Sequence, residues 1–294
     1  MTIDVQYAGV TFPDVLQTRG LYQLRPDLPF TPGWEVAGVV REDAGAFRRG
    51  DRVAAMPVVG GFAETVNVVP DMVFPVPDDV SLDVAAALPL NYLTADFALR
   101  RRGGLRAGEC VLVHGAGGGV GTASCQMAAA LGARVIAVVS TAEKAERAEQ
   151  AGAHDVVMAD GFLERVRELT DGRGVDLVVD PVGGDRFLDS LRSMRPEGRL
   201  LVIGFAGGGI PTVKINRLLL TNTSVIGVAV AEFWRVEPAF ARSQWDAIMP
   251  RVRAGELAPV VGNRYPLSDI SQALQDVDER RSAGKALIEV RQRP

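Results

Sequence analysis

The sequence predicts an α/β protein in which a doubly wound parallel sheet is accompanied by a smaller, β-rich domain. Between residues 110 and 230, short and nearly continuous apolar segments alternate with helical segments, and a glycine-rich turn follows the first of them. Apolar runs of this kind are typical of parallel strands that helices cover on both faces. Valine-rich segments interrupted by prolines before residue 78 indicate the β-rich domain.

The expected strands of the β-rich part are short and are bounded by Gly, Pro and Asp. They lie at residues 35–40, 51–55 and 63–69, and the prolines between residues 29 and 77 argue against long helices there. A helix is expected to begin after Ser81, because a hydroxyl side chain that can cap a helix precedes an apolar run. A helical pattern continues at residues 94–101.

The central part of the chain carries the alternation that predicts the parallel sheet. The expected strands are residues 110–114, 134–140, 155–158, 175–180, 199–203 and 224–230, and the expected helices are residues 120–131, 142–150, 162–169 and 187–194. The tail then contains a helix at 238–253, a strand at 257–261, a helix at 268–280 and a strand at 285–290.

Composition excludes several classes of protein. Of the 294 residues, 47% are hydrophobic, and the formal net charge is −4, so the chain has ample apolar surface for a core and no basic footprint for nucleic acid. No apolar run approaches the roughly 20 residues that span a bilayer, and we see no signal peptide. We therefore expect a cytoplasmic protein with neither a nucleic-acid nor a membrane partner.

The glycine-rich turn is the sharpest local feature. It follows the strand that ends at His114 and opens a helix, with the spacing A-x-G-x-x-G. Glycines allow a backbone to approach a pyrophosphate closely, and the helix amino terminus supplies free N–H groups. A glycine turn without a ligand is the alternative. The strand–turn–helix context favours a dinucleotide site made of Ala116, Gly117, Gly118, Gly119, Val120 and Gly121.

The end of the second strand favours NADPH over NADH. An NAD-binding turn usually places Asp or Glu there to bind the ribose 2′-OH, whereas this chain has Ser140 and Thr141. Lys144 follows, with Arg147 further along the helix, and cations near this position suit a 2′-phosphate. The alternative for Lys144 and Arg147 is a solvated helix face.

Metal-ligating residues are few. The chain contains His114, His154, Cys110 and Cys125, all in the predicted nucleotide-binding half and without metal-ligand spacing. We predict no metal site. We also expect the two cysteines and His114 to be structural rather than reactive.

Several segments, in this order, are similar to the zinc-independent quinone oxidoreductases (zeta-crystallin-like) of the medium-chain dehydrogenase/reductase superfamily. They are residues 8–14, 20–22, 29–40, 50–53, 88–95, the glycine turn, 176–184 and 198–205. The resemblance implies a GroES-like β domain, completed by the tail, and a Rossmann domain that binds NADPH. It suggests domain ranges of 1–92 with 256–294 and of 93–255, and a homodimer.

The chain departs from the family pattern at several positions. Family members begin with about 25–30 further residues, which is a small fraction of a typical domain. We expect a GroES-like domain without its first strands; the alternative is that the start of this sequence is misassigned or truncated. Thr11 stands where Asn is frequent, Leu16 where some members have Tyr, and Ala159 near where Tyr contacts the 2′-phosphate. Trp34 stands where a zinc dehydrogenase would have a ligating His.

The resemblance also implies further site residues. Thr94 matches a position near the nicotinamide, and loops at the carboxyl ends of strands supply further cofactor contacts. Arg280 and Lys285 resemble positions that face the cofactor cleft, with Arg280 the stronger candidate. For catalysis the candidates are Tyr22, Asp14 and Thr11; a packing role for Tyr22 and a turn role for Asp14 are the alternatives. The loop residues are Val182, Gly183, Gly204 and Phe205.

Three functional hypotheses follow. The first is an NADPH:quinone reductase, because a quinone that accepts hydride forms a delocalised anion and needs little general acid. The second is an NADPH-dependent reductase of α,β-unsaturated carbonyl compounds (2-alkenals or enoyl thioesters), whose enolate gains more from a placed donor. The third is a cofactor-binding protein without catalysis.

Overall fold

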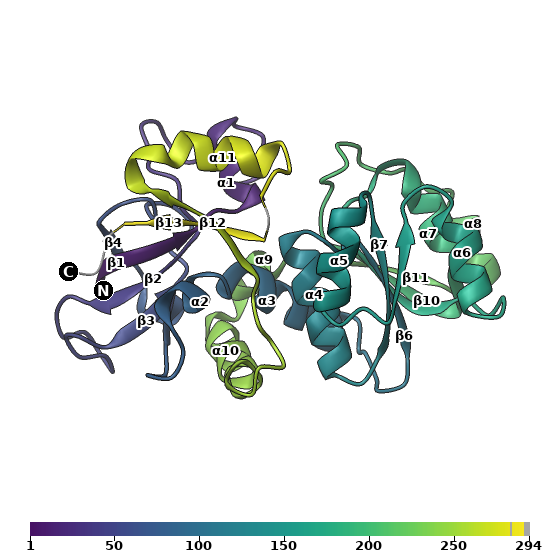
Figure 1. Ribbon diagram of the computed structural model, residues 1–294, viewed down its shortest axis with the longest axis horizontal. Helices are drawn as coiled ribbons and strands as arrows, with labels where there is room; N and C mark the ends of the chain where they lie inside the picture. Colours follow the sequence, from purple (N-terminus) through teal and green to yellow (C-terminus); the bar gives the residue numbers. More distant parts are fainter. Residues whose placement is uncertain (283, 291–294) are drawn as a thin grey trace. The chain divides into compact units, whose positions relative to one another are not determined.

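The computed structural model describes residues 1–282 and 284–290, and the chain divides into two compact units. The first unit contains Met1–Leu93 and Phe233–Pro294, and the second contains Thr94–Glu232 (Figure 1). Residues 291–294 of our expected domain range lie outside the described part.

The segment 233–255, which we assigned to the nucleotide-binding domain, lies instead in the first unit. Its helix α10 (Pro238–Arg253) packs against β5 (Val73–Pro75). The Trp245 ring stacks on Phe74 with centroids 5.1 Å apart, and its Nε1 donates to the carbonyl oxygen of Pro75 at 2.8 Å. Burial of these aromatic rings holds α10 on the first unit.

The second unit is built on a six-stranded parallel sheet in the order β11-β10-β9-β6-β7-β8, which confirms the doubly wound prediction. Figure 1 shows α4 and α5 on one face and α6, α7 and α8 on the other. The elements are η2 (Phe97–Arg102), β6 (Cys110–His114), α4 (Gly119–Ala130), β7 (Arg134–Val139), α5 (Ala142–Gln150), β8 (Asp155–Met158), α6 (Phe162–Leu169), β9 (Val175–Asp180), η3 (Gly184–Arg186), α7 (Phe187–Arg192), β10 (Met194–Val202), α8 (Asn216–Thr221) and β11 (Ser224–Gly227).

Strand order in this sheet determines where a ligand can bind. The chain runs from β6 outward to β7 and β8, and then returns to β9 on the other side of β6. The carboxyl ends of β6 and β9 therefore form the switch point at which doubly wound sheets bind ligands. Leu112, Ile136, Val178 and Leu200, one from each of four neighbouring strands, are fully buried and hold the sheet rigid beneath this point.

The first unit is built on a seven-stranded sheet in the order β12-β13-β1-β2-β3-β5, with β4 also paired to β1. Its pairs are antiparallel except for β12 and β13, so the tail completes the sheet in which the chain begins. The strands are β1 (Thr2–Gly9), β2 (Glu35–Val40), β3 (Arg52–Ala55), β4 (Thr65–Asn67), β5, β12 (Val261–Pro266) and β13 (Lys285–Glu289). The helices are α1 (Phe12–Thr18), η1 (Pro70–Met72), α2 (Leu82–Ala86), α3 (Pro89–Asp96), α9 (Val230–Val236), α10, η4 (Leu267–Asp269) and α11 (Ile270–Asp278), of which α3 and α9 cross the unit boundaries.

Helix α1 interrupts a region that we expected to be mostly β. Thr11 and Asp14 form a reciprocal capping box, and Pro13 occupies the first turn, where its missing N–H has no helical partner to lose. Two other boundaries differ from expectation. The predicted strand at 257–261 lies at Val261–Pro266, and α9 begins at Val230, where we had continued a strand.

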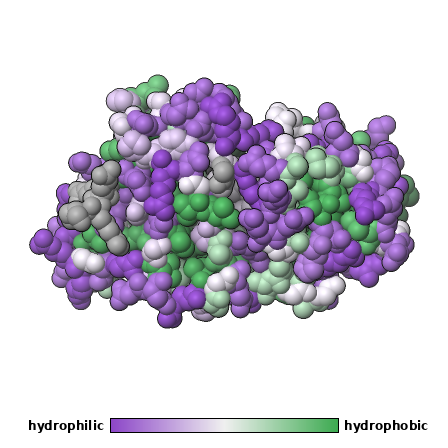
Figure 2. Space-filling model, viewed as in Figure 1, coloured by the Kyte–Doolittle hydropathy of each residue, from purple (hydrophilic) through white to green (hydrophobic). Residues whose placement is uncertain are grey.

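Hydrophilic residues cover most of the face shown in Figure 2, with smaller hydrophobic patches between them. None of the helices in the described part of the chain combines the length and the hydropathy that crossing a membrane requires.

Candidate functional site

The glycine turn after β6 is closely packed. A Cβ atom on Gly121 would lie 2.1 Å from the carbonyl oxygen of Gly115, so only glycine allows α4 to begin there. Gly115 has φ of +60°, and its Cβ would meet Val182 at 3.1 Å. Gly118, the N-cap of α4, has no side chain to cap the helix, so the first N–H groups of this 12-residue helix remain available for an anion.

The end of β7 brings a cation to this turn. A Cβ on Gly117 would lie 2.6 Å from Cβ of Lys144, so the stem of Lys144 lies against the glycine turn. The Lys144 Nζ donates to Oγ of Ser140 at 3.3 Å, and the Thr141 Oγ1 caps α5 by accepting from the Lys144 N–H at 3.3 Å. A hydroxyl and an ammonium with no carboxylate at the strand end fit a 2′-phosphate better than a bare ribose 2′-OH. Arg147 forms an ion pair with Glu143 on the same helix.

The loops after β9 and β10 meet beside the glycine turn. Asp180 Oδ1 accepts from the N–H groups of Val182 at 2.9 Å and Gly183 at 2.8 Å. Gly183 has φ of +64°, and a Cβ there would lie 2.9 Å from the Phe205 ring. Gly207 N–H donates to the carbonyl oxygen of Val182 at 2.8 Å, which joins the two loops. The predicted loop contacts, including Gly204, thus converge at the switch point.

His114 is enclosed at the end of β6. Its Nε2 lies 2.8 Å from Oγ of Ser190, and its ring meets Phe162 edge-on with centroids 4.9 Å apart. Burial disfavours the charged imidazolium and lowers the pKa of His114 to about 4, although Asp180 opposes the shift. A neutral and enclosed imidazole fits the structural role that we expected. Cys110 and Cys125 are also buried, and burial raises the pKa of both thiols.

Asp14 organises the catalytic candidates of the first unit. Its Oδ2 accepts from the N–H of Thr11 at 2.8 Å and from the Thr11 hydroxyl at 2.6 Å, and its Oδ1 accepts from the Gly33 N–H at 3.0 Å. Burial raises the pKa of this carboxyl to about 6, while the hydrogen bonds from Thr11 and the charge of Lys285 act in the opposite direction. Asp14 is fully buried, so it fastens α1 to the segment before β2.

Tyr22 lies beside a pair of residues that sequence reasoning did not connect. Its ring meets Trp34 edge-on with centroids 5.3 Å apart, and Trp34 Nε1 donates to Oε1 of Gln17 at 2.8 Å. We had noted Trp34 only as a replacement for a metal ligand, and Gln17 not at all. Gln17 follows Asp14 by three residues, the spacing of one helix face, but that signal required α1 to be recognised.

A buried ion pair between Glu35 and Lys285 was also missed. The Lys285 side chain is 6% exposed and Glu35 0%, and the other oxygen of Glu35 accepts from the Leu90 N–H at 2.7 Å. The resemblance implies that Lys285 faces the cofactor cleft. Instead, it neutralises a carboxylate inside the first unit.

The remaining candidates lie on their separate elements. Thr94 is buried in α3, in the second unit, and Arg280 lies on an exposed turn after α11, in the first unit, with φ of +59°. The structure thus brings together the cofactor candidates from Ala116 to Phe205 in the second unit. It brings together Thr11, Asp14 and Gly33, and separately Tyr22 and Trp34, in the first.

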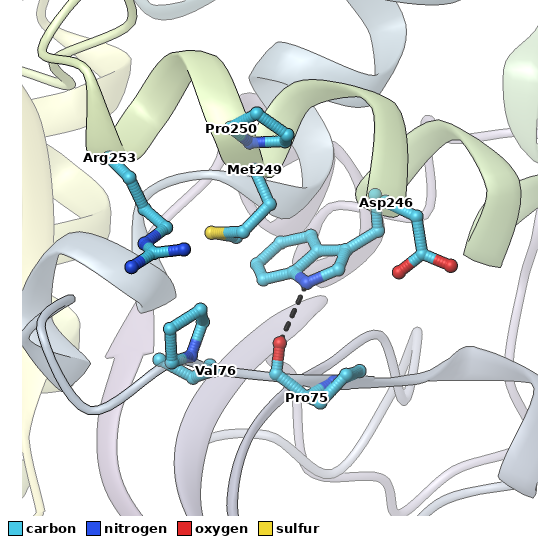
Figure 3. Close-up of a pocket in the computed structure, with 8 residues that line it drawn as sticks. Pro75, Val76, Asp246, Met249, Pro250 and Arg253 are labelled. Carbon is cyan, nitrogen blue, oxygen red and sulfur yellow. Dashed lines mark hydrogen bonds between the residues drawn. The ribbon is translucent and has the colours of Figure 1, made fainter.

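A pocket of about 330 Å³ lies between α10 and the segment that follows β5 (Figure 3). Pro75, Val76, Met249 and Arg253 contribute to its lining. Trp245 also lines it, and its Nε1 donates to the carbonyl oxygen of Pro75. None of the predicted site residues lines it. In residues 1–282 and 284–290, no group of three or more His, Cys, Asp or Glu side chains is arranged to hold a metal ion.

A glycine turn and a cation at the switch point of a doubly wound sheet define the second unit as a dinucleotide-binding domain of the kind that dehydrogenases and reductases use. Residues 1–78 match the family model of the alcohol dehydrogenase GroES-like domain, and residues 119–249 match that of the zinc-binding dehydrogenases. The chain belongs to the quinone oxidoreductase family of the medium-chain dehydrogenases/reductases.

Individual relatives agree with this assignment. Quinone oxidoreductase-like protein 2 of Bos taurus is 40% identical over 296 residues, covering 98% of this chain and 84% of its own length. A probable oxidoreductase from Mycobacterium abscessus is 45% identical with a TM-score of 0.90, covering 98% of this chain and 89% of that one. The quinone oxidoreductase of Thermus thermophilus, solved also with NADPH, is 35% identical with a TM-score of 0.87, covering 98% and 91%.

Proposed function

We propose that this protein is a zinc-independent, cytoplasmic NADPH:quinone reductase. The observation that carries the cofactor assignment is the Lys144 side chain, which lies against Gly117 and bonds to Ser140 where NAD-specific proteins place a carboxylate. Relatives and structural neighbours that are quinone oxidoreductases support the choice of acceptor.

Bound NADPH would supply a hydride to the acceptor. The N–H groups that begin α4 would hold the pyrophosphate, and Lys144 and Ser140 would hold the 2′-phosphate. Backbone groups of Val182, Gly183, Gly204 and Phe205 would line the nicotinamide side, with Thr94 and Arg280 as the further contacts that we propose.

The negative charge that develops on a quinone oxygen is delocalised over the ring, so the chain's own residues add only a modest further stabilisation. Tyr22 is the proposed hydroxyl donor, since no histidine outside the second unit is present in the sequence. Asp14 and Thr11 act on it indirectly, by fastening α1 and the Gly33 segment. Solvent supplies the proton that completes the hydroquinone, so a dedicated general acid is not needed.

Reduction of an α,β-unsaturated carbonyl compound is the second candidate. The observation that favours it is the edge contact of Tyr22 with Trp34, which restrains a phenol that could donate to an enolate. A cofactor-binding protein without catalysis is the third candidate, and the experiment below tests it.

We further propose that two copies associate through the edge of the six-stranded sheet. The edge strand β11 and the neighbouring α8 expose Leu219 (74%), Leu220 (77%) and Val225 (36%), and Ile215 before α8 is 77% exposed. Apolar surface of this density on a sheet edge favours pairing with a second copy.

The test is NADPH oxidation, with NADH alongside, against p-benzoquinone, phenanthrenequinone, trans-hexenal and crotonyl-CoA. We expect NADPH-dependent turnover of the quinones, and Tyr22→Phe to reduce it only modestly. Turnover of the enal or thioester that collapses in Tyr22→Phe would establish the second candidate instead. NADPH binding without turnover of any acceptor would support the third.

A further inference from the structure

The first unit contains two buried tryptophan–glutamine pairs of the same kind. Trp34 Nε1 donates to Oε1 of Gln17 at 2.8 Å, and Trp234 Nε1 donates to Oε1 of Gln244 at 2.8 Å. Both glutamines are almost completely buried, at 3% and 2% exposure. An indole N–H can only donate, so each amide must turn its oxygen toward the indole and its NH₂ group away. The orientation of both amides is therefore determined by chemistry.

The two pairs differ in what the NH₂ group meets. Nε2 of Gln244 donates to the carbonyl oxygen of Leu93 at 2.9 Å. Nε2 of Gln17 is enclosed and has no hydrogen-bond acceptor among residues 1–282 and 284–290. Buried N–H donors nearly always have a hydrogen-bond acceptor. We therefore expect an acceptor for Gln17 Nε2 that the described residues do not supply.

The unpartnered amide lies in the cluster that contains the proposed hydroxyl donor. The Tyr22 ring packs edge-on against Trp34, the same indole that orients Gln17. Asp14, one turn earlier on α1, anchors the helix that carries Gln17. Gln17, Trp34 and Tyr22 thus form one group in which each contact restrains the next.

We propose that Nε2 of Gln17 donates a hydrogen bond to the carbonyl oxygen of the electron acceptor, and that Trp34 aims it by holding Oε1. This inference rests on the proposed function and adds a specific recognition element to it: the acceptor presents a carbonyl oxygen to α1. Because Nε2 is enclosed, the oxygen reaches it only when a neighbouring side chain moves. Tyr22, which is only half-buried and whose ring contacts Trp34, is the side chain that we propose to move.

Reduction of the quinone to the hydroquinone requires no proton from Gln17. Bound NADPH would supply a hydride, with its electron pair, to the quinone and would become NADP⁺. One quinone oxygen takes the negative charge, and a proton from solvent completes the hydroquinone. A neutral amide N–H stabilises the anionic oxygen and keeps its own proton, as donors of an oxyanion hole do.

The test compares Gln17→Met with Gln244→Met in the full chain. Both changes remove the acceptor of a tryptophan N–H, but only the first removes an unpartnered amide donor. We expect Gln17→Met to lower kcat/KM for p-benzoquinone by about 10- to 100-fold, which is less than the loss of an oxyanion-hole donor in acyl transfer because the quinone charge is delocalised. The fall should appear mainly in kcat, because the charge develops in the transition state. Gln244→Met should keep kcat within about threefold of wild type, and the dissociation constant of NADPH should be unchanged in both.

A second variant removes the donor but keeps an acceptor for Trp34. Gln17→Glu donates nothing when ionised, so it should show the same loss in kcat at neutral pH. The urea midpoint of each variant is measured alongside to show that it is folded, because a buried carboxylate costs stability. Equal kcat values for Gln17→Met, Gln17→Glu and wild type would overturn the proposal and leave Nε2 as a donor to water only. Equal losses in the Gln17 and Gln244 variants would overturn it in favour of packing. A wild-type protein that reduces no quinone would refute the proposed function first, and this inference with it.

Discussion

Lys285 and Glu35 form an ion pair that is enclosed within the first unit, with side-chain exposures of 6% and 0%. Lys285 begins β13 and Glu35 begins β2, and β1 lies between these strands in the sheet. The pair leaves no room for a side chain at Gly9 of β1, whose Cβ would lie 2.5 Å from Oε1 of Glu35. A single charge pair therefore connects the tail to the segment that carries Gly33 and Trp34.

Removing one partner of this pair should be costly. Lys285→Met leaves a buried carboxylate without its counter-charge, so we expect a loss of about 3–5 kcal/mol in the free energy of unfolding. Glu35→Gln combined with Lys285→Met should recover part of that loss, since no unpaired charge remains. Urea denaturation of wild type, single and double variants measures both values. A single variant as stable as wild type would show that the pair contributes nothing.

His114 should make the protein less stable in acid. Its pKa is lowered from 6.5 to about 4 by burial, so between these values the unfolded chain binds a proton that the folded chain does not. This contribution to stability is full above about pH 6.5 and is lost as the pH falls toward 4, by at most about 3 kcal/mol. We expect His114→Gln to flatten this acid slope in urea titrations from pH 4 to 7. A variant with the wild-type slope would contradict the assignment.

Asp14 should act with the opposite sign in an overlapping range. Burial raises its pKa from 3.8 to about 6, so the folded chain holds a proton that the unfolded chain has lost. Its contribution is present below about pH 4 and is lost as the pH rises to about 6. Asp14→Asn lacks this loss. The change in its free energy of unfolding as the pH rises from about 4 to about 6 should therefore be more positive than that of wild type. It should also lose about 1 kcal/mol at every pH from the broken capping box.

Lys144 should discriminate between the two nicotinamide cofactors. Lys144→Ala removes the cation beside Ser140, and a charged hydrogen bond of this kind is worth about tenfold or more in affinity. We expect the dissociation constant of NADPH to rise by that factor while that of NADH stays unchanged, as measured by fluorescence titration. Lys214→Ala, which removes an exposed lysine from the same unit, is the control. An equal loss for both cofactors would refute recognition of a 2′-phosphate.

The exposed leucines of α8 should control association. Leu219→Asp with Leu220→Asp places charges on the proposed pairing surface, and we expect the dimer to dissociate to monomers in sedimentation velocity. Leu28→Asp changes a leucine of the first unit that is 85% exposed and should leave the association unchanged. A wild-type protein that sediments as a monomer would rule out the dimer.

Local patterns in the sequence were sufficient for much of the fold. Apolar strands such as Cys110–His114 and Val175–Asp180, and helices such as Ala142–Gln150, were predicted at their observed bounds, because periodicity and turn residues act over a few positions. The glycine turn was likewise recognisable, since its strand–turn–helix context is continuous along the chain. Helix α1 was not predicted. Its capping box, Thr11 to Asp14, lies among prolines and valines that favour strands and loops.

Contacts between distant segments could not be predicted in this way. Nothing local marks Lys285 as the partner of Glu35, since they meet only because β13 and β2 flank β1 in one sheet. No local pattern distinguishes Gln17 from other polar residues. Its amide is enclosed only because α1 packs beside the segment that contains Trp34. The same holds for residues 233–255, whose place in the first unit is decided by the stacking of Trp245 on Phe74. Burial and partner choice are properties of the packed chain, because they depend on which surfaces meet and not on the order of neighbouring residues.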